Sequence, residues 1–391
     1  MPPPRTAATF APPVMEARRW LDGVSFAPER PLINVSQAAP VDPPPHALRQ
    51  VMAEVALTRD DAHLYGPVLG LPELRAELAD QWSDGYGGAI RPDQVGITSG
   101  CNQAFAAAIA TLCAEGDEVI VPTPWYFNHK MWLDMSGVSA VPLTTGADMR
   151  PDADQAAALI TPRTRAIALV SPNNPAGVEY PPALLRAFME LARSRGIALI
   201  LDETYRDFHA QSGAPHDLFT DPQWHDTLIH LYSFSKAYRL TGHRVGAIVC
   251  AQDRLAEVEK FLDTVAICPA QLGQHAALWG MRNLKQWLAG ERDEILSRRA
   301  AIEAGFPDLA ERGWRLLGVG AYFAYLAHPF SLSSADLAPR LVREAGVLCL
   351  PGTMFCPPDD PSGRGQLRIA FANLDRDGIG TLFERLKGFA G

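Results

Sequence analysis

Two serine hydroxyls lie beside one lysine in the stretch 233–246, and an arginine follows the lysine. The spacing is S-x-S-K-x7-R-x-G, and its defined positions are Ser233, Ser235, Lys236, Arg244 and Gly246. The apolar runs 228–232 and 246–250 on either side are short enough to be strands. We therefore expect the lysine on a tight connection between two strands of one sheet. An ammonium group is unusual there, because lysines are almost never buried without a partner.

The chemistry that these residue types offer is the capture of an aldehyde and of a phosphate. An unprotonated lysine is an amine nucleophile that condenses with an aldehyde. The serine hydroxyls and Arg244 offer charge-assisted hydrogen bonds to a phosphate. A ligand that carries both groups is pyridoxal 5'-phosphate (PLP). The alternative is that Lys236 and Arg244 are solvated loop charges, as most such residues are, and the remaining motifs decide between the two readings.

The chain around this lysine alternates short apolar runs with stretches of helical periodicity. Strands are expected at 95–98, 118–121, 166–170, 197–201 and 228–232, each followed by polar residues. Buried strands separated by helices predict an α/β fold with a mostly parallel sheet covered by helices on both faces. Ligands of such sheets bind beyond the carboxyl ends of the strands. The polar clusters are therefore candidates for one common site.

The cluster after the first of these strands opens a helix with small residues. Gly100, Cys101 and Asn102 would leave backbone N–H groups free, and together with the helix dipole these groups make an anion site. By itself the cluster is better explained by a plain N-cap from Ser99 or Thr98. Next to a phosphate held near the lysine, we interpret the three residues as phosphate contacts.

A carboxylate follows another strand. Asp202 comes directly after the apolar run 197–201, and a carboxylate at a buried strand end needs a partner. A pyridine nitrogen supplies one, because the carboxylate keeps that nitrogen protonated and the ring electron-withdrawing. Tyr205 follows three residues later in the sequence. A helix N-cap or a salt bridge is the alternative role for Asp202.

In the order and spacing of these elements the chain resembles class I and II aminotransferases of PLP fold-type I. This resemblance implies a large domain with a mostly parallel, seven-stranded sheet covered by helices. The resemblance runs from about residue 32 to the end, and it is similar to the branch with bacterial aspartate, aromatic and kynurenine aminotransferases. The stretch 171–177 looks like the family's N-P-x-N-P-T-G signature, with Ser171 and Ala176 in place of Asn and Thr. Cys101 stands where many relatives have Ala or Gly.

The resemblance implies roles for further residues. Tyr126 would stack on the cofactor ring, with its neighbour Trp125 as the alternative and core packing as the other explanation. Asn174 would donate to the phenolic oxygen of the cofactor. The residues expected to contact the cofactor are then Tyr65, Gly100, Cys101, Asn102, Tyr126, Asn174, Asp202, Tyr205, Ser233, Ser235, Lys236 and Arg244.

The substrate and the neighbouring subunit also have expected contacts. Arg368 matches the family's anchor for the substrate α-carboxylate, since a guanidinium fork fits a carboxylate in bidentate geometry. Asn174 and Ala38 are the other expected substrate contacts, although relatives often have a glycine at the position of Ala38. Tyr65 resembles the tyrosine that reaches the phosphate in the neighbouring subunit, which implies a homodimer with shared sites.

The activity implied by the resemblance is the transfer of an amino group between an L-amino acid and a 2-oxo acid, with ping-pong kinetics. Lys236 would hold PLP as an internal aldimine and then move a proton between the substrate Cα and the cofactor C4′, with Asp202 and Tyr205 assisting. A C–S β-lyase or a decarboxylase on the same scaffold is the nearer alternative. A ligand sensor fused to a DNA-binding module is the more distant one, and no basic helix-turn-helix supports it.

Composition excludes several other classes of protein. The chain has 391 residues and a formal net charge of -9, so it lacks the basic field of a nucleic-acid binder. Its apolar runs are too short to span a membrane, and its start lacks the apolar core of a signal peptide, so we expect a cytoplasmic enzyme. The six cysteines form no C-x-x-C pair, which argues against disulfides and against a metal site.

A chain of this length favours two domains. We expect an N-terminal arm and part of the small domain over 1–40, a large PLP-binding domain over 41–285, and a smaller α+β domain over 286–391. Helix is expected over 253–285, and one strand over 347–350. Candidates for the pocket of the substrate side chain, each equally explained by surface or packing roles, are His129, Tyr238 and Arg239.

Overall fold

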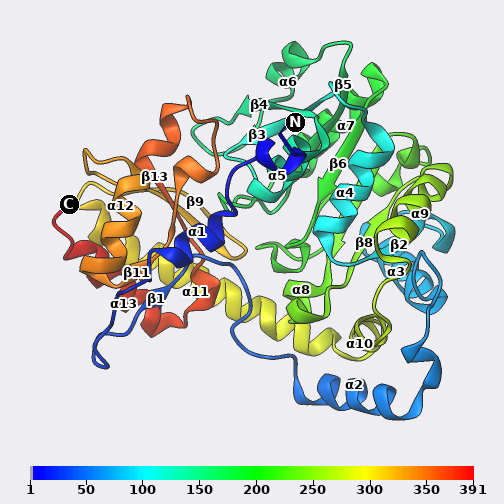
Figure 1. Cartoon of the computed structure of the whole chain (residues 1–391), viewed down its shortest axis with the longest axis horizontal. Helices are drawn as coiled ribbons and strands as arrows, with labels where there is room; N and C mark the ends of the chain where they lie inside the picture. Colours follow the sequence, from blue (N-terminus) through cyan, green and yellow to red (C-terminus); the bar gives the residue numbers. More distant parts are fainter. Residues whose placement is uncertain (1–2) are drawn as a thin grey trace.

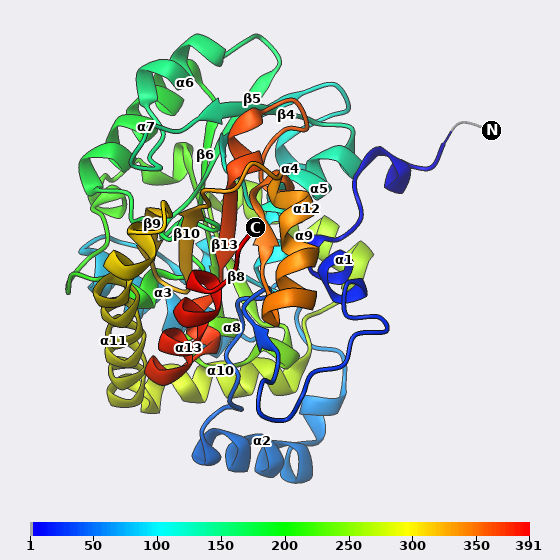
Figure 2. The same cartoon turned by 90° about the vertical axis from the view of Figure 1, so that its left-hand side faces the viewer.

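The computed structural model describes residues 3–391 and consists of a larger and a smaller part (Figure 1). The larger part is built on a seven-stranded sheet and the smaller part on a four-stranded sheet. Helix α2 (His46–Thr58) lies at the lower edge of the molecule in both views, apart from the two sheets (Figures 1 and 2). Within residues 3–391, none of the helices combines the length and the apolar character needed to cross a membrane.

The large sheet has the strand order β2-β8-β7-β6-β5-β3-β4. All neighbouring strands are parallel except at β8, which runs antiparallel to β2 and β7. This confirms the predicted α/β fold with a mostly parallel, seven-stranded sheet. The bounds are β2 (Val95–Thr98), β3 (Glu118–Thr123), β4 (Ser139–Thr144), β5 (Thr164–Val170), β6 (Ala198–Asp202), β7 (Leu228–Ser233) and β8 (Gly246–Val249).

Two layers of helices cover the two faces of this sheet. Successive side chains along a strand pack alternately against one layer and the other. Leu199 and Leu201 face the core formed with α3, α7 and α10, whereas Ile200 faces the core formed with α4, α5 and α9. The bounds are α3 (Pro72–Tyr86), α4 (Cys101–Leu112), α5 (Phe127–Ser136), α6 (Ala153–Leu159), α7 (Pro182–Arg195), α9 (Gln252–Ala266) and α10 (Gln271–Asn283).

The smaller part combines the C-terminal third of the chain with its N-terminal segment. Its antiparallel sheet has the order β12-β13-β10-β9, and a separate parallel pair joins β1 to β11 with Ile33 opposite Val347. Figure 2 shows α11, α13 and α12 around this sheet. The bounds are α1 (Pro13–Arg19), β1 (Ile33–Asn34), α11 (Lys285–Ala310), β9 (Arg315–Gly320), β10 (Phe323–Ala327), α12 (Ser334–Arg340), β11 (Val347–Leu348), β12 (Leu350–Pro351), β13 (Gln366–Ile369) and α13 (Arg376–Lys387).

Two predicted elements differ from the structure. The helix expected over 253–285 is interrupted after α9, where Ile267 has a φ of 63° and Pro269 has no N–H to donate. The single strand expected over 347–350 is two short strands in different sheets, because β11 pairs with β1 while β12 pairs with β13. Cys349 lies between them and marks the change of partner.

Candidate active site

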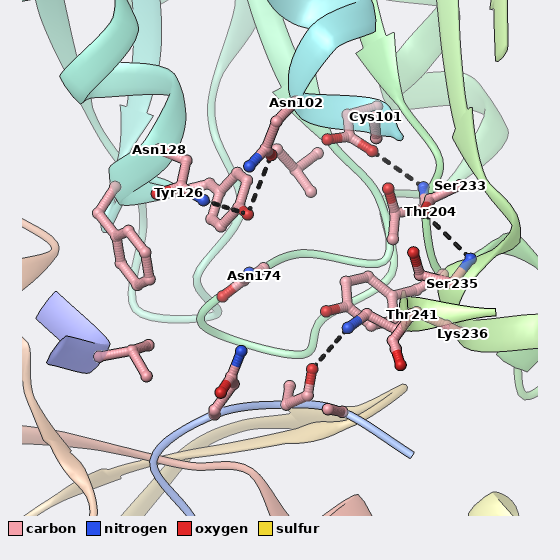
Figure 3. Close-up of a pocket in the computed structure, with 18 of the residues that line it drawn as sticks. Cys101, Asn102, Tyr126, Asn128, Asn174, Thr204, Ser233, Ser235, Lys236 and Thr241 are labelled. Carbon is pink, nitrogen blue, oxygen red and sulfur yellow. Dashed lines mark hydrogen bonds between the residues drawn. The ribbon is translucent and has the colours of Figure 1, made fainter. Parts of the chain in front are cut away.

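A cavity of about 540 Å³ lies where β5, β6 and β7 end and the smaller part of the chain begins. Figure 3 shows side chains from several elements converging on it. The expected site residues that line it are Ala38, Cys101, Asn102, Tyr126, Asn174, Asp202, Tyr205, Ser233, Ser235, Lys236, Arg244 and Arg368. The cavity therefore brings together predicted site residues that are far apart in the chain. They come from an N-terminal segment, the large sheet and the small sheet.

Lys236 enters the cavity from a short helix, α8 (Phe234–Ala237), that follows β7 directly. The Ser233 hydroxyl caps this helix by accepting the N–H of Ser235. The Lys236 Nζ donates to the carbonyl oxygen of Ala38 at 2.6 Å. Burial lowers the pKa of this lysine from 10.5 to about 8, and the neighbouring Arg244 and Arg368 add to the effect. The amine is therefore far easier to deprotonate than that of a surface lysine.

The first turn of α4 is open toward the cavity. Its N-cap is Gly100, with a φ of 84°, and no side chain caps the helix, so neither Ser99 nor Thr98 has the capping role considered above. Gly246 of β8 packs directly beneath, because a Cβ there would lie 2.6 Å from the carbonyl carbon of Gly100 and 2.7 Å from the nitrogen of Cys101. The uncapped N–H groups and the helix dipole favour an anion at this place.

Arg244 stands beside this helix start. It has a left-handed backbone (φ 51°), and its Nη1 donates to the Ser235 hydroxyl at 3.3 Å and to the carbonyl of Thr241 at 3.1 Å. A Cβ on Gly100 would overlap with the Arg244 guanidinium, so only glycine leaves room for both groups. Hydroxyl, guanidinium and backbone N–H groups thus share one end of the cavity, a donor set suited to phosphate.

Asp202 is buried at the end of β6 and has a histidine partner. Its Oδ2 lies 3.3 Å from Nε2 of His129, and its Oδ1 accepts the N–H of Thr204 at 2.9 Å. Burial by itself would raise the pKa of Asp202, but the close His129 ring and the hydrogen bond from Thr204 hold it below its usual value. The His129 ring is fixed by stacking on Phe105 at a centroid distance of 3.8 Å. The carboxylate is therefore charged and fixed where it meets the cavity.

Arg368 projects from β13 and is buried. Its Nη1 donates to Oδ1 of Asn174 at 3.0 Å, and its Nη2 donates to the carbonyl of Ser36. Its Nε has no hydrogen-bond partner within residues 3–391. Burial lowers the pKa of Arg368 to about 10, and the rings of Phe323 and Phe355 lie 5.1 Å and 5.0 Å from the guanidinium carbon. A buried cation in this setting favours an anionic ligand.

Two tyrosines complete the cavity wall. Tyr126 ends the loop before α5, and its hydroxyl accepts from Nδ2 of Asn128 at 2.8 Å and donates to Oδ1 of Asn102 at 3.3 Å (Figure 3). Burial and the nearby Asp202 raise the pKa of Tyr126 to about 12. Burial also raises the pKa of Tyr205 well above its usual value. Both hydroxyls are therefore neutral hydrogen-bonding groups at physiological pH.

Several predicted residues do not line the cavity. Gly100 shapes the helix start without lining it, whereas Tyr65 is 80% exposed and outside the cavity of its own chain, as a residue predicted to reach the neighbouring subunit would be. Of the three candidates for the side-chain pocket, none lines the cavity. His129 contacts Asp202, Tyr238 packs against Gly280, and Arg239 pairs with Glu291.

Eight residues that line the cavity were not predicted from the sequence. They are Val14, Gln37, Ala39, Phe127, Asn128, Val170, Thr204 and Thr241. Asn128 and Thr204 had a signal, because each stands two residues after an expected site residue at the same strand or helix end. Val14 had none, since its place in the cavity depends on where the N-terminal arm packs.

The residues present fit PLP, judged on three observations of this structure. The open first turn of α4 beside Arg244 matches the phosphate, with glycines where a Cβ would collide. The lowered pKa of Lys236 suits an amine that reacts with an aldehyde. The charged carboxylate of Asp202 suits a protonated ring nitrogen.

Comparison with known proteins agrees with this arrangement. The model of the family described as aminotransferase class I and II matches residues 30–386. The chain is 29% identical over 332 residues to the aromatic aminotransferase ISS1 of Arabidopsis thaliana, covering 83% of this chain and 81% of that protein. It is 32% identical over 310 residues to the arginine–pyruvate transaminase AruH of Pseudomonas aeruginosa, covering 78% and 77%. A mutant of the Thermus thermophilus aspartate aminotransferase superposes with a TM-score of 0.87 at 24% identity, covering 98% of both chains.

Proposed function

The chain belongs to the class I and II aminotransferase family, whose members use PLP, and from this premise we propose how its residues divide the work of transamination. The proposed reaction moves the amino group of an L-amino acid to a 2-oxo acid in two half-reactions with ping-pong kinetics. When bound, PLP supplies an aldehyde that takes up the amino group and a ring that withdraws electrons from the substrate Cα. The observation that carries the proposal is the buried Lys236 of lowered pKa in one cavity with the buried Arg368.

One set of residues would hold the cofactor. The N–H groups at the start of α4, the Ser235 hydroxyl and Arg244 would bind the phosphate. Asp202 would keep a proton on the ring nitrogen, and His129 would keep Asp202 charged and in place. The ring of Tyr126 would lie against the ring of the cofactor and restrict its tilt.

A second set would bind the substrate and move the proton. Arg368 would bind the α-carboxylate, and Asn174, which already accepts from Arg368, would keep the guanidinium oriented. The Lys236 amine would bind the aldehyde carbon of the cofactor and, once displaced, take the proton from the substrate Cα and return it at C4′. Tyr205 would donate to the phenolic oxygen of the cofactor, since its hydroxyl stays protonated.

The proposal includes a homodimer with shared sites. Tyr65 is 80% exposed in the single chain, and Leu57 and Leu64 beside it are exposed apolar residues. Exposed apolar groups gathered on one segment favour a protein interface. In the dimer, Tyr65 would reach the phosphate in the cavity of the other subunit.

The test is a half-reaction without acceptor. Purified protein with PLP is mixed with single L-amino acids, and the loss of the cofactor's visible absorption and the 2-oxo acid released are measured. We expect about one 2-oxo acid per subunit and no further turnover until a 2-oxo acid is added. Continuous release of ammonia and pyruvate without an acceptor would contradict transamination and identify a β-lyase.

Replacing the lysine provides the matched control. Lys236→Ala should lower turnover by at least about 1000-fold, because both the cofactor anchor and the proton carrier are lost. Lys260→Ala removes a lysine that pairs with Glu257 on the exposed face of α9, and this variant should retain normal turnover. Appreciable transamination by Lys236→Ala would refute the role given to that residue.

A further inference from the structure

Two asparagines and a tyrosine form a hydrogen-bonded chain on one wall of the cavity. Nδ2 of Asn128 donates to the Tyr126 hydroxyl, and this hydroxyl donates to Oδ1 of Asn102. All three residues line the cavity. Since the hydroxyl accepts one hydrogen bond and donates the other, one carboxamide turns its NH2 group to the tyrosine and the other turns its oxygen to it. Oδ1 of Asn128 is left as an acceptor and Nδ2 of Asn102 as a donor, and neither atom has another side-chain partner within residues 3–391.

Asn102 belongs to the first turn of α4, whose N–H groups are the proposed phosphate contacts, but the two carboxamides lie across the cavity from Lys236. Figure 3 shows Asn102, Tyr126 and Asn128 on one side of the cavity, and Ser233, Ser235 and Lys236 on the opposite side. The pair also lies near the proposed carboxylate anchor, since the ring of Phe127, which precedes Asn128, is 5.8 Å from the Arg368 guanidinium carbon. A substrate bound to the guanidinium would therefore extend its side chain toward the two carboxamides.

Each charged side chain on the cavity wall already has a proposed partner in the cofactor or in the substrate α-carboxylate. Among the described residues that line it, the charged side chains are Asp202, Lys236, Arg244 and Arg368. The proposed function assigns them in turn to the ring nitrogen, the aldehyde, the phosphate and the α-carboxylate. A carboxylate on the substrate side chain would lose water without meeting a further cation from the described residues of this chain, which is unfavourable.

Resting on the proposed function, we propose that Asn102 and Asn128 select amino donors whose side chain ends in a carboxamide. Such a group has one acceptor and one donor atom, which match the free donor of Asn102 and the free acceptor of Asn128. Tyr126 is a positioning residue in this selection, because its hydroxyl holds both carboxamides in the required orientation. Dicarboxylic donors are rejected for lack of a cation, and apolar donors of the same shape leave the two amide atoms unpaired.

Binding of unreactive analogues tests the selection apart from turnover. The holoenzyme is titrated with succinamate, succinate and 4-methylpentanoate, which present a carboxamide, a carboxylate and an apolar group on similar chains and have no amino group. We expect the dissociation constant of succinamate to be at least about 10-fold lower than that of either other ligand. The half-reaction should follow the same order for L-asparagine over L-aspartate and L-leucine. Equal or tighter binding of succinate would overturn the inference.

Two variants test whether the preference for a carboxamide depends on the proposed residues. Asn128→Leu should reduce the preference for succinamate over 4-methylpentanoate to within about threefold, and Tyr126→Phe, which keeps the ring, should reduce it in the same direction. Tyr180→Phe is the matched control, because it removes another buried tyrosine hydroxyl, bonded to Asn173, that does not line the cavity. This control should keep the full preference.

The outcomes separate the two proposals. If amino acids convert the cofactor but the preference survives in both Asn128→Leu and Tyr126→Phe, the selection by these residues is wrong while the proposed transamination stands. If no amino acid converts the cofactor, the proposed function fails and this inference fails with it.

Discussion

Burial of Lys236 beside two guanidinium groups sets the pH range in which its amine reacts. With a pKa of about 8, roughly a tenth of the lysine is unprotonated at about pH 7, against roughly 0.03% for an ordinary lysine. Only the unprotonated amine attacks the aldehyde. The rate constant for PLP uptake by the cofactor-free protein should therefore rise about tenfold per pH unit and level off above about pH 8. A rise that continues to about pH 10 in a stopped-flow measurement would contradict the lowered pKa.

The contact between His129 and Asp202 predicts a second effect of pH. Without the His129 ring beside it, burial acts more strongly to raise the pKa of Asp202, so the carboxylate is protonated as the pH falls. His129→Leu should lower kcat/KM by roughly 10-fold at about pH 8 and by more at about pH 6. His129→Gln keeps an N–H donor and should recover part of the loss. Equal losses in the two variants at every pH would show that the polar contact with Asp202 is not the cause.

At the scale of residues, the sequence was informative where chemistry demands a residue type. A lysine beside hydroxyls and a carboxylate at a strand end could be identified because each is costly to bury without a ligand. Arg368 on a late strand was identified only through the family resemblance. The partner of Asp202 was missed for a different reason. His129 lies one turn after Tyr126 on α5, so the i, i+3 spacing placed it near the site, but only the packing of α5 against the sheet shows which group it contacts.

At the scale of elements, the contact between β8 and the start of α4 holds the anion site open. A Cβ on Gly246 would push against the backbone of Gly100 and Cys101. Gly246→Ala should raise the dissociation constant of PLP by at least about 10-fold and destabilise the fold by roughly 1–3 kcal/mol. Gly242→Ala is the matched control, since a Cβ there has no heavy atom within 4 Å and should change neither quantity. Equilibrium dialysis measures the PLP affinity, and thermal unfolding measures the stability. Unchanged PLP affinity in Gly246→Ala would refute the role given to this contact in phosphate binding.

Elements were predictable in proportion to their burial. The central strands read as apolar runs because helices cover both faces, and they were found within a few residues of their ends. The edge strand β4 was missed because it is largely exposed and contains Pro142, so it has neither an apolar run nor clear alternation. Helix α2 was missed because only Leu48 on it is buried. The split of 347–350 between two sheets depends on distant partners, which local sequence does not report.

At the scale of the whole molecule, the cavity is assembled from segments that must dock on one another. Arg368 on β13 is held by the carbonyl of Ser36 from the N-terminal segment, and Lys236 is held by the carbonyl of Ala38 from the same segment. This segment therefore lies between the two reactive cations. Its place was not predictable from its own composition, because its hydrogen-bond partners lie hundreds of residues later in the chain.

The proposed sharing of sites between subunits makes a prediction for mixed dimers. Tyr65→Ala should weaken PLP binding by roughly 10-fold, because one hydroxyl to a phosphate is lost, while Lys236→Ala should be inactive. In a hybrid of the two variants, one cavity combines an intact Lys236 with an intact Tyr65 from the other subunit, and the second cavity has lost both.

Mixing the two variants under conditions that exchange subunits should therefore restore activity at low PLP concentration, above the sum of the separate variants. Mixing Lys236→Ala with Asp202→Ala provides the contrast. Asp202 and Lys236 line the same cavity of one chain, so every cavity in that hybrid has one defect and no activity should return. If the mixture with Tyr65→Ala gains nothing although exchange is demonstrated by mass, each cavity is complete within one chain and the exposed Tyr65 has another role.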